Sequence, residues 1–259
     1  AYLALFLWPL VCMVVYQSTD ALAATSFTML GGFLLLPERV SFDAPLIPPL
    51  NKESLSALTA LVMLYIKGHV SLFPLPSAGL LRVCVLALVF GPVVTVFTNT
   101  EPVIMGDRYI AGLTNHDAFS SVVNGYLNIL PFILATKLID TTEDMHRVLK
   151  HLLVAGLCVS LPALYEARMS PQLHATVYGF FPHSFIQQKR FDGFRPVVFT
   201  QHGLWLAMFF ATTLVAAAVF VRTNTRVLSL PPTVTLIYLV LVLVLCKSVG
   251  PTVLGIGML

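Results

Sequence analysis

Long apolar runs separated by short polar connections fill most of this chain. A helix that crosses a bilayer needs about 20 largely apolar residues, and about eight runs approach that length, several of them short. They predict helices over residues 3–16, 22–36, 55–66, 79–97, 122–139, 152–165, 203–221 and 234–246, and a run over 249–259 begins a ninth. The pattern predicts an all-α fold, in which residues 1–259 form a single multi-pass transmembrane bundle of about eight or nine helices.

Glycine and proline interrupt several of these runs. Gly31 and Gly32 are expected to break the second helix. Gly91 and Pro92 predict a kink in the fourth helix, and Pro131 falls inside the fifth. Broken helices form the midplane substrate sites of many transporters, so a transporter is one alternative function. Few ionisable residues fall in mid-span, however, and no internal repeat is visible.

The polar connections also carry information. Residues 37–52 are rich in proline and predict an extended surface loop. Where this loop meets the third helix, Asn51 or Ser54 is expected to cap the helix. Residues 140–150 place acids first and bases last, which suits the dipole of a helix that begins there. Residues 166–201 are the longest polar connection. We expect them to form a functional extracytoplasmic loop, because long loops in compact proteins usually carry function.

Composition places the chain in a membrane. It is 57% hydrophobic and 10% charged, with a mean hydropathy of +0.86, whereas a soluble domain is about 25% charged. The net charge of +3 comes without a polybasic run, so we expect no nucleic-acid partner. The cysteines lie in apolar runs without metal-ligand spacing, and we interpret them as buried hydrophobic residues that hold no metal: Cys12, Cys84, Cys158 and Cys246.

The chain starts at Ala1 and stops at Leu259, each inside an apolar run. This favours a piece of a longer protein, truncated at both ends.

The basic residues give an orientation. Under strict alternation of the helices, one side carries Lys67, Arg82, Lys137, Arg147, Lys150, Arg222 and Arg226. The other side carries Arg39, Lys52 and Arg108, together with Arg168, Lys189, Arg190 and Arg195 in the long loop. The positive-inside rule places the first set in the cytoplasm. The bases of the long loop then oppose the rule, so either the orientation is reversed or these bases serve a function outside the cytoplasm. The clear bias in the shorter loops favours the second.

Three short segments resemble a known family. Residues 190–203 (RFDGFRPVVFTQHG) lead into the seventh helix, residues 165–179 (YEARMSPQLHATVYG) follow the sixth, and residues 246–251 (CKSVGP) form a polar break between two helices. Together they resemble the O-antigen ligase and O-antigen polymerase superfamily of bacterial polysaccharide assembly, the second segment its exopolysaccharide branch. The family often has Ser-Arg-Gly in the polar break. Here Val249 follows Ser248, and Lys247 is expected to supply the charge instead.

The resemblance implies a glycosyltransferase in the bacterial cytoplasmic (inner) membrane. Its donor would be a polyprenyl-diphosphate-linked glycan, and its acceptor a lipid-linked glycan or another glycan at the outer face. Fixed guanidinium groups can stabilise a diphosphate leaving group without a metal or a cofactor. The diphosphate-binding candidates are Arg190 and Arg195, followed by Arg168 and Lys247. The implied partners are this donor, membrane lipids and other membrane proteins.

Glycosyl transfer also needs a base for the acceptor hydroxyl, and histidine suits that role near neutral pH. His174 and His202 are the catalytic candidates, and His183 lies within reach. In the family, the base lies in a further extracytoplasmic loop, beyond the point where this chain stops. Asp192 is expected to orient the arginines.

Each candidate also has a structural interpretation. Arg190 and Arg195 would contact lipid headgroups, and Lys247 would extend from a helix end to the interface. Glu166 and Arg168 would pair with each other, and His202 would cap the seventh helix. A non-catalytic membrane subunit of a larger assembly is therefore a second alternative.

Overall fold

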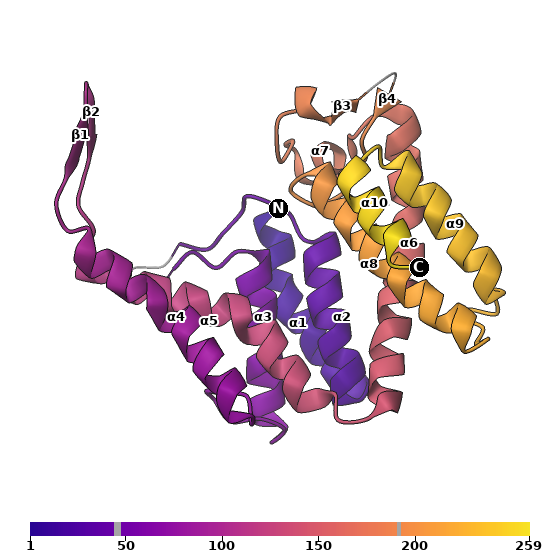
Figure 1. Ribbon diagram of the computed structural model, residues 1–259, viewed down its shortest axis with the longest axis horizontal. Helices are drawn as coiled ribbons and strands as arrows, with labels where there is room; N and C mark the ends of the chain where they lie inside the picture. The colour runs from indigo at the N-terminus through magenta and orange to yellow at the C-terminus, as the bar shows by residue number, and fades with distance from the viewer. Residues whose placement is uncertain (44–47, 191–192) are drawn as a thin grey trace. The chain divides into compact units, whose positions relative to one another are not determined.

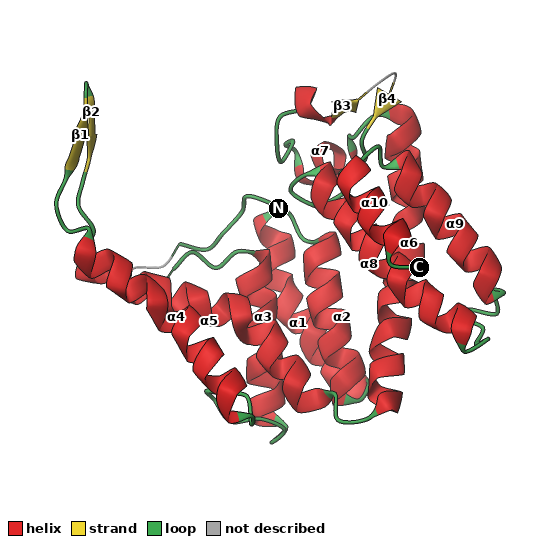
Figure 2. Cartoon of the chain, in the orientation of Figure 1, coloured by secondary structure: helices red, strands yellow, loops and turns green. Residues whose placement is uncertain are grey.

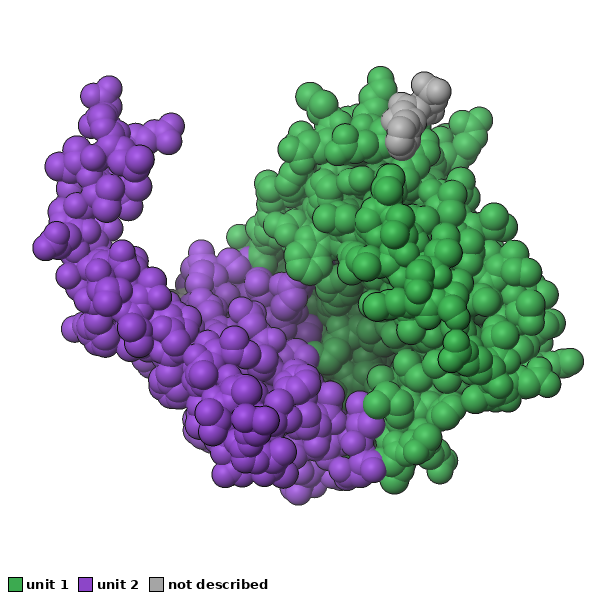
Figure 3. Space-filling model, in the orientation of Figure 1, with its two compact units in different colours: residues 1–40, 141–259 green, residues 41–140 purple. Residues whose placement is uncertain are grey.

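The computed structural model describes residues 1–43, 48–190 and 193–259, so Asp192 and part of the proline-rich loop lie outside the described residues. Most of the chain is helical, and the only strands among the described residues form two short ribbons (Figures 1 and 2). The chain divides into two compact units, residues 1–40 with 141–259 (unit 1) and residues 41–140 (unit 2), which Figure 3 colours separately.

Unit 1 is a helical bundle with a structured loop at one end, where α7, β3 and β4 gather in Figure 1. Its elements are α1 (Tyr2–Ser18), α2 (Ala21–Leu35), α6 (Thr142–Met169), α7 (Leu173–Tyr178), η1 (Ile186–Gln188), β3 (Lys189–Arg190), β4 (Gly193–Phe194), α8 (Gly203–Arg222), α9 (Pro232–Leu245) and α10 (Val249–Gly257).

Helix α8 is the centre of unit 1. It packs against α6, α9 and α10, and its residues Leu206, Phe210 and Leu214 are fully buried in one apolar core. Gly156 of α6 lies tightly against α8, because a Cβ atom there would overlap the side chain of Thr213. The core therefore depends on a glycine in α6 as well as on the apolar faces of the helices.

The expected break at Gly31 and Gly32 is wrong. Helix α2 runs through both glycines without interruption, and both are buried. The Trp8 ring of α1 lies so close that a Cβ atom on Gly31 would be 2.6 Å from it, so the glycine serves helix packing. Helix α4 likewise continues through Pro92. Helix α2 is therefore not the broken helix that the transporter alternative assumed.

Several helix starts are capped as the sequence predicted. The Asn51 side chain accepts a hydrogen bond from the backbone N–H of Ser54 at 2.9 Å, so Asn51 is the cap of α3. Thr141 and Asp144 form a reciprocal capping box at the start of α6. These polar contacts fix where two apolar helices begin.

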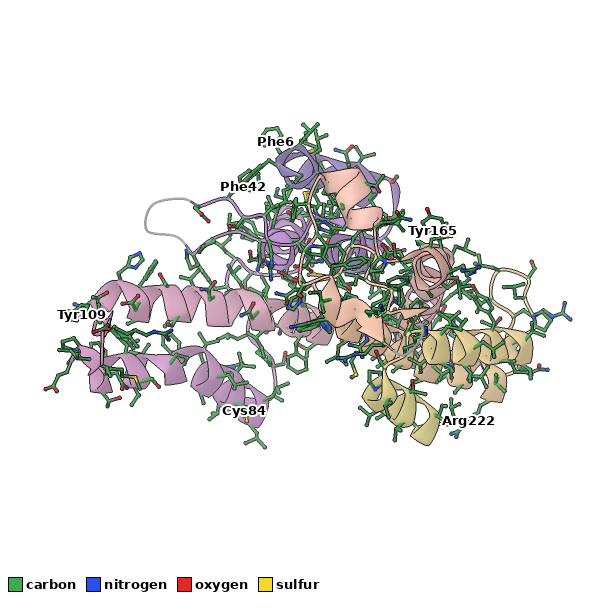
Figure 4. The ribbon with its side chains drawn as sticks, turned by 90° about the horizontal axis from the view of Figure 1, so that it is seen from above. Phe6, Phe42, Cys84, Tyr109, Tyr165 and Arg222 are labelled. Carbon is green, nitrogen blue, oxygen red and sulfur yellow. The ribbon has the colours of Figure 1, made fainter. Side chains whose placement is uncertain are left out.

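Unit 2 consists of α3 (Lys52–Ile66), α4 (Gly79–Thr98), a hairpin of β1 (Val103–Met105) and β2 (Arg108–Ile110), and α5 (Asn115–Leu138). Helix α5 packs along α4 and α3. The hairpin extends beyond the ends of α4 and α5, where Figure 4 labels Tyr109, and both of its strands are exposed. Cys84 of α4 and Cys158 of α6 are exposed, contrary to the expectation that all four cysteines are buried, and Cys84 points away from α5 in Figure 4.

Four helices within the described residues are long and apolar enough to cross a membrane: α4, α5, α6 and α8. Helices α1, α2 and α9 are apolar but shorter. Only 17% of the apolar stretch of α4 is buried, against 56% for α8, so much of the apolar surface of α4 faces outward. The chain is thus a mostly helical membrane protein, and four of the eight or nine predicted spans have the required length.

Candidate functional site: a basic cluster beside helix α8

The loop between α6 and α8 is anchored by one buried carboxylate. Glu166 is 1% exposed, and one of its oxygens, Oε1, accepts hydrogen bonds from the backbone N–H groups of Gln172 (3.0 Å) and Leu173 (2.8 Å). The other, Oε2, accepts from the N–H groups of Val197 (2.8 Å) and Val198 (2.6 Å). One side chain therefore holds the first and the last part of the loop together, at the level where α6 ends.

This anchor also supports an unusual backbone conformation. Val198 has φ +53°, a region that β-branched residues rarely adopt and that costs of order 1–3 kcal/mol. Its side chain is buried, and its N–H makes the shortest of the four hydrogen bonds to Glu166. The turn at Val198 directs the preceding residues, including Arg195, back toward the start of α8.

Gln188 connects the middle of the loop to the same place. It is fully buried, and its backbone oxygen accepts a hydrogen bond from the N–H of Arg195 at 2.8 Å. Its side-chain oxygen lies 3.4 Å from the N–H of Gly203, the first residue of α8. The β3–β4 ribbon follows directly, with Arg190 opposite Gly193. Gln188 thus fixes the backbone from which both arginines project.

Arg195 is the most enclosed cation of the site. It is 9% exposed, and its Nη2 donates to the backbone oxygen of Lys247 at 3.2 Å. Its Nε is buried and has no acceptor among the described residues. Burial, and then the charge of Arg190, lower the pKa of Arg195 below its ordinary value. A guanidinium has five N–H donors, so most of this one's capacity is left for an anion.

A glycine makes room for this side chain. A Cβ atom on Gly203 would overlap Cγ and Cδ of Arg195, so the arginine passes directly over the first residue of α8. The N-terminus of a helix carries partial positive charge and unpaired N–H groups. Arg195 therefore lies where the helix itself also favours an anion.

Lys247 approaches from the turn between α9 and α10. A Cβ atom on Gly193 would overlap Nζ of Lys247, which places the ammonium group against the β3–β4 ribbon. Beside it opens a cavity of about 350 Å³, lined by Val244, Lys247, Ser248, Val249, Thr252 and Val253. The ammonium group therefore lies between the loop and a mostly apolar recess.

We define the basic cluster as Arg190, Arg195 and Lys247. Arg190 is exposed on β3, and its charge acts on Arg195 and on His202. Arg168 is exposed in the last turn of α6 and makes no ion pair within residues 1–43, 48–190 and 193–259. The interpretation that Arg168 pairs with Glu166 is wrong, because four backbone groups occupy that carboxylate.

His174 is part of the scaffold. It is 1% exposed, its Nε2 accepts the backbone N–H of Glu38 at 3.1 Å, and its Nδ1 donates to the backbone oxygen of Phe180 at 2.8 Å. Both ring nitrogens are therefore engaged by the backbone. This geometry leaves no nitrogen for an acceptor hydroxyl, which argues against the catalytic role suggested for His174.

His202 caps α8, as one interpretation of the sequence held. Its Nδ1 accepts the backbone N–H of Leu204 at 3.1 Å, so in the neutral ring Nε2 carries the proton and acts as a donor. Burial, and then the charges of Arg195, His183 and Arg190, lower the pKa of His202 below its ordinary value. A neutral His202 in this position can donate a hydrogen bond to an anion but is poorly arranged to accept a proton.

His183, which the sequence placed within reach of the site, lies beside His202. The two imidazole rings meet edge to face, with centroids 5.0 Å apart. Nδ1 of His183 is buried without a partner among the described residues. No pattern in the sequence distinguished His183, Gln188 or the anchoring role of Glu166, because all three depend on how the loop folds back on itself.

The site therefore brings together Arg190, Arg195, Lys247, His183 and His202 and leaves Arg168 apart. Within the described part of the chain, no group of three or more His, Cys, Asp or Glu side chains is placed to hold a metal ion. The chemistry available to these residues is anion binding with nearby imidazole. Comparison with known protein families, with curated proteins and with solved structures gives no match for this chain.

Proposed function

We propose that this membrane protein binds the diphosphate of a polyprenyl-diphosphate-linked glycan and transfers the glycan to a lipid-linked or glycan acceptor. The observation that carries this proposal is the basic cluster, in which Arg195 is buried with donors to spare. Burying a cation without a counter-charge is costly unless an anion joins it. The resemblance of residues 190–203 to the O-antigen ligase and polymerase superfamily supports the same donor.

The chemistry needs one charge-stabilising group and one base. As the bond between the sugar carbon and the diphosphate oxygen breaks, negative charge grows on the leaving group, and Arg195 with Arg190 stabilises it. The proton on Nε2 of His202 is available as a further hydrogen bond. The acceptor oxygen forms the new bond to the sugar carbon and releases its proton. No metal takes part in this scheme.

We assign the base to His183 in place of His174 and His202. His174 has both nitrogens occupied by backbone groups, and His202 uses Nδ1 to cap α8. His183 makes no hydrogen bond within the described residues and adjoins the cluster. A base for the acceptor hydroxyl needs a ring nitrogen that no backbone group occupies, and Nδ1 of His183 meets that condition within the described residues.

Binding of farnesyl diphosphate to the purified protein in detergent, measured by calorimetry, tests the first step. Arg195→Ala should weaken binding about tenfold to a hundredfold, because hydrogen bonds to charged groups contribute about 1.5–3 kcal/mol. Arg226→Ala is the matched control, since Arg226 is an exposed arginine outside the cluster. Unchanged affinity in Arg195→Ala would contradict the proposal.

A second variant moves the guanidinium without removing its charge. In Gly203→Ala the new methyl group would displace Arg195, and binding should fall as in Arg195→Ala. Gly91→Ala is its control, because a Cβ atom there meets open space.

Transfer from a polyprenyl-diphosphate-linked oligosaccharide then tests catalysis. His183→Ala should abolish product formation and leave diphosphate affinity within about twofold, whereas a wild-type protein that binds without transferring would be a non-catalytic subunit.

A further inference from the structure

A second recess in unit 1 lies away from the basic cluster, between α2 and the first half of α6. Its volume is about 430 Å³, within the range of about 300–1,000 Å³ that is typical of small-molecule pockets. Leu30 and Leu34 of α2 and Val154, Ala155 and Val159 of α6 form much of its wall. On α6 the lining runs from Lys150 to Val159, about 14 Å along the helix axis at about 1.5 Å per residue. The recess is therefore an elongated apolar groove parallel to the helices.

One end of this groove is polar. Lys150 is exposed there without an ion pair among the described residues, and Nδ1 of the neighbouring His151 is buried without a hydrogen-bond partner among them. One turn earlier on α6, Arg147 forms an ion pair with Asp20, the cap of α2. Arg147 and Asp20 therefore compensate each other's charge, whereas Lys150 makes no ion pair within the described residues.

The same level marks the edge of the apolar part of α6. Its 28 residues extend about 42 Å, which is longer than the hydrocarbon core of about 30 Å. Charged residues occur from Glu143 to Lys150, and the helix is then apolar until Tyr165. Lys150 and His151 thus lie where the headgroup region would meet the hydrocarbon region, at the opposite end of α6 from Glu166.

We propose that this groove holds one acyl chain of an anionic glycerophospholipid, with its phosphate at Lys150 and His151. The groove offers an apolar channel along the membrane normal and a cation with an unpaired imidazole nitrogen at its interfacial end, which matches an amphiphile with one negative head. Another protein helix would cover the apolar wall but would leave the lysine and the imidazole nitrogen without a partner.

Native mass spectrometry of the purified protein with added dioleoyl phosphatidylglycerol or dioleoyl phosphatidylcholine tests the proposal. The protein should retain one phosphatidylglycerol molecule, and the retained amount should be about fivefold greater than for phosphatidylcholine, because a single interfacial lysine attracts an anionic headgroup to about that degree. Lys150→Glu should remove the preference, and Arg226→Glu should keep it, because Arg226 is an exposed arginine that does not line the groove. Equal retention of both lipids by the wild type would overturn the proposal.

Filling the groove tests the place of the acyl chain. Ala155→Phe should abolish the retained phosphatidylglycerol, whereas Ala87→Phe, at an exposed alanine of α4, should not. Cys158 provides a second measurement that leaves the groove wall unaltered, in case Ala155→Phe does not fold. In a Cys84→Ser protein, Cys158 is the remaining exposed thiol among the described residues, and phosphatidylglycerol should slow the reaction of Cys158 with N-ethylmaleimide at least severalfold. The proposal would be overturned if lipid left the labelling rate of Cys158 unchanged. It would also be overturned if Ala155→Phe changed the oligomeric state of the protein while lipid retention stayed the same.

Discussion

Glu166 shows how much of this site depends on a residue that touches no substrate in the proposed mechanism. Its two oxygens accept four backbone N–H groups, two from each end of the loop. A buried N–H that loses its acceptor costs about 1–3 kcal/mol. The positions of Arg195 and of the strained Val198 therefore depend on a single side chain of α6.

Glu166→Gln should lower the free energy of unfolding by roughly 2–6 kcal/mol. The amide nitrogen of glutamine cannot accept a hydrogen bond, so two backbone N–H groups would lose their acceptor at a cost of about 1–3 kcal/mol each. Denaturant titration of the detergent-purified protein measures the change. Glu101→Gln, at an exposed carboxylate, should stay within about 0.5 kcal/mol. A loss of similar size in both variants would show that Glu166 is no anchor.

His202 gives the site a dependence on pH. Its pKa is lowered in the folded protein by burial and then by neighbouring positive charges, so the unfolded chain takes up the proton first as pH falls. Stability should therefore decrease as pH falls below the ordinary histidine value of about 6.5 and level off below the folded pKa. Protonation also removes the acceptor that caps α8.

His202→Asn separates this effect from other acid effects, because asparagine caps helices well and does not titrate. The unfolding free energy of this variant should fall less than that of the wild type between neutral and acidic pH, and His116→Asn, at an exposed histidine, should follow the wild type. Parallel pH profiles for all three proteins would exclude His202 as the source.

The chemistry of the site was partly visible in the sequence. Arg190, Arg195 and Lys247 stood out because cations are rare in so apolar a chain, and the structure places them together. The sequence offered capping as one role for His202, but it could not choose among roles for the histidines at 174, 183 and 202, since the residue type is the same. What separates them is which backbone groups the folded loop brings to each ring.

At the scale of elements, helix packing in unit 1 depends on small residues at close approaches. Gly156 of α6 faces Thr213 of α8 with no space for a methyl group, and Gly31 of α2 faces Trp8 of α1. Helices in lipid gain from such approaches, because van der Waals contact takes the place of the hydrophobic driving force between them.

Gly156→Ala should destabilise the protein by about 1–3 kcal/mol, because the added methyl group overpacks the interface between α6 and α8. Without the clash, alanine in a helix would stabilise by roughly 0.5–1 kcal/mol over glycine, as expected for Gly91→Ala in α4. Thermal unfolding in detergent compares the two variants. Stabilisation by both would mean that the two helices lie farther apart.

Hydrophobic periodicity and capping residues in the sequence were good guides to where helices occur. Proline and glycine were poor guides to where helices break. Asn51 and the pair Thr141–Asp144 cap helices where expected, because capping is a local interaction. Gly31 and Gly32 were misinterpreted as a break, because their reason lies on another helix, in Trp8. Local patterns cannot reveal a requirement that a distant neighbour imposes.

For the whole molecule, the distribution of apolar side chains defines the solvent. Helix α4 carries Leu80, Leu88, Phe90 and Val94 with at least half of each side chain exposed. In water such a surface would cause aggregation, whereas in lipid it is the ordinary exterior of a spanning helix. Four helices of sufficient length share this property to different degrees.

Leu88→Arg tests this directly, since Leu88 is 63% exposed near the middle of α4. In a bilayer, an arginine at a helix centre should raise the apparent free energy of insertion by roughly 2.5–3.5 kcal/mol. Leu80→Arg, at an 80% exposed position in the first turn, should cost much less, because the side chain can extend to the interface. A microsomal insertion assay measures both, and equal, small effects would argue that α4 does not span.

The anchoring of the loop by Glu166 has a consequence for how such a protein can diversify. Because residues 172–173 and 197–198 meet at one carboxylate, the chain between them can lengthen or shorten without moving the ends that hold it. Insertions between Phe180 and His183 would alter what approaches the basic cluster from outside, while Gln188 keeps Arg195 over the start of α8. Under the proposed function, recognition of the acceptor and retention of the diphosphate could thereby evolve at separate rates.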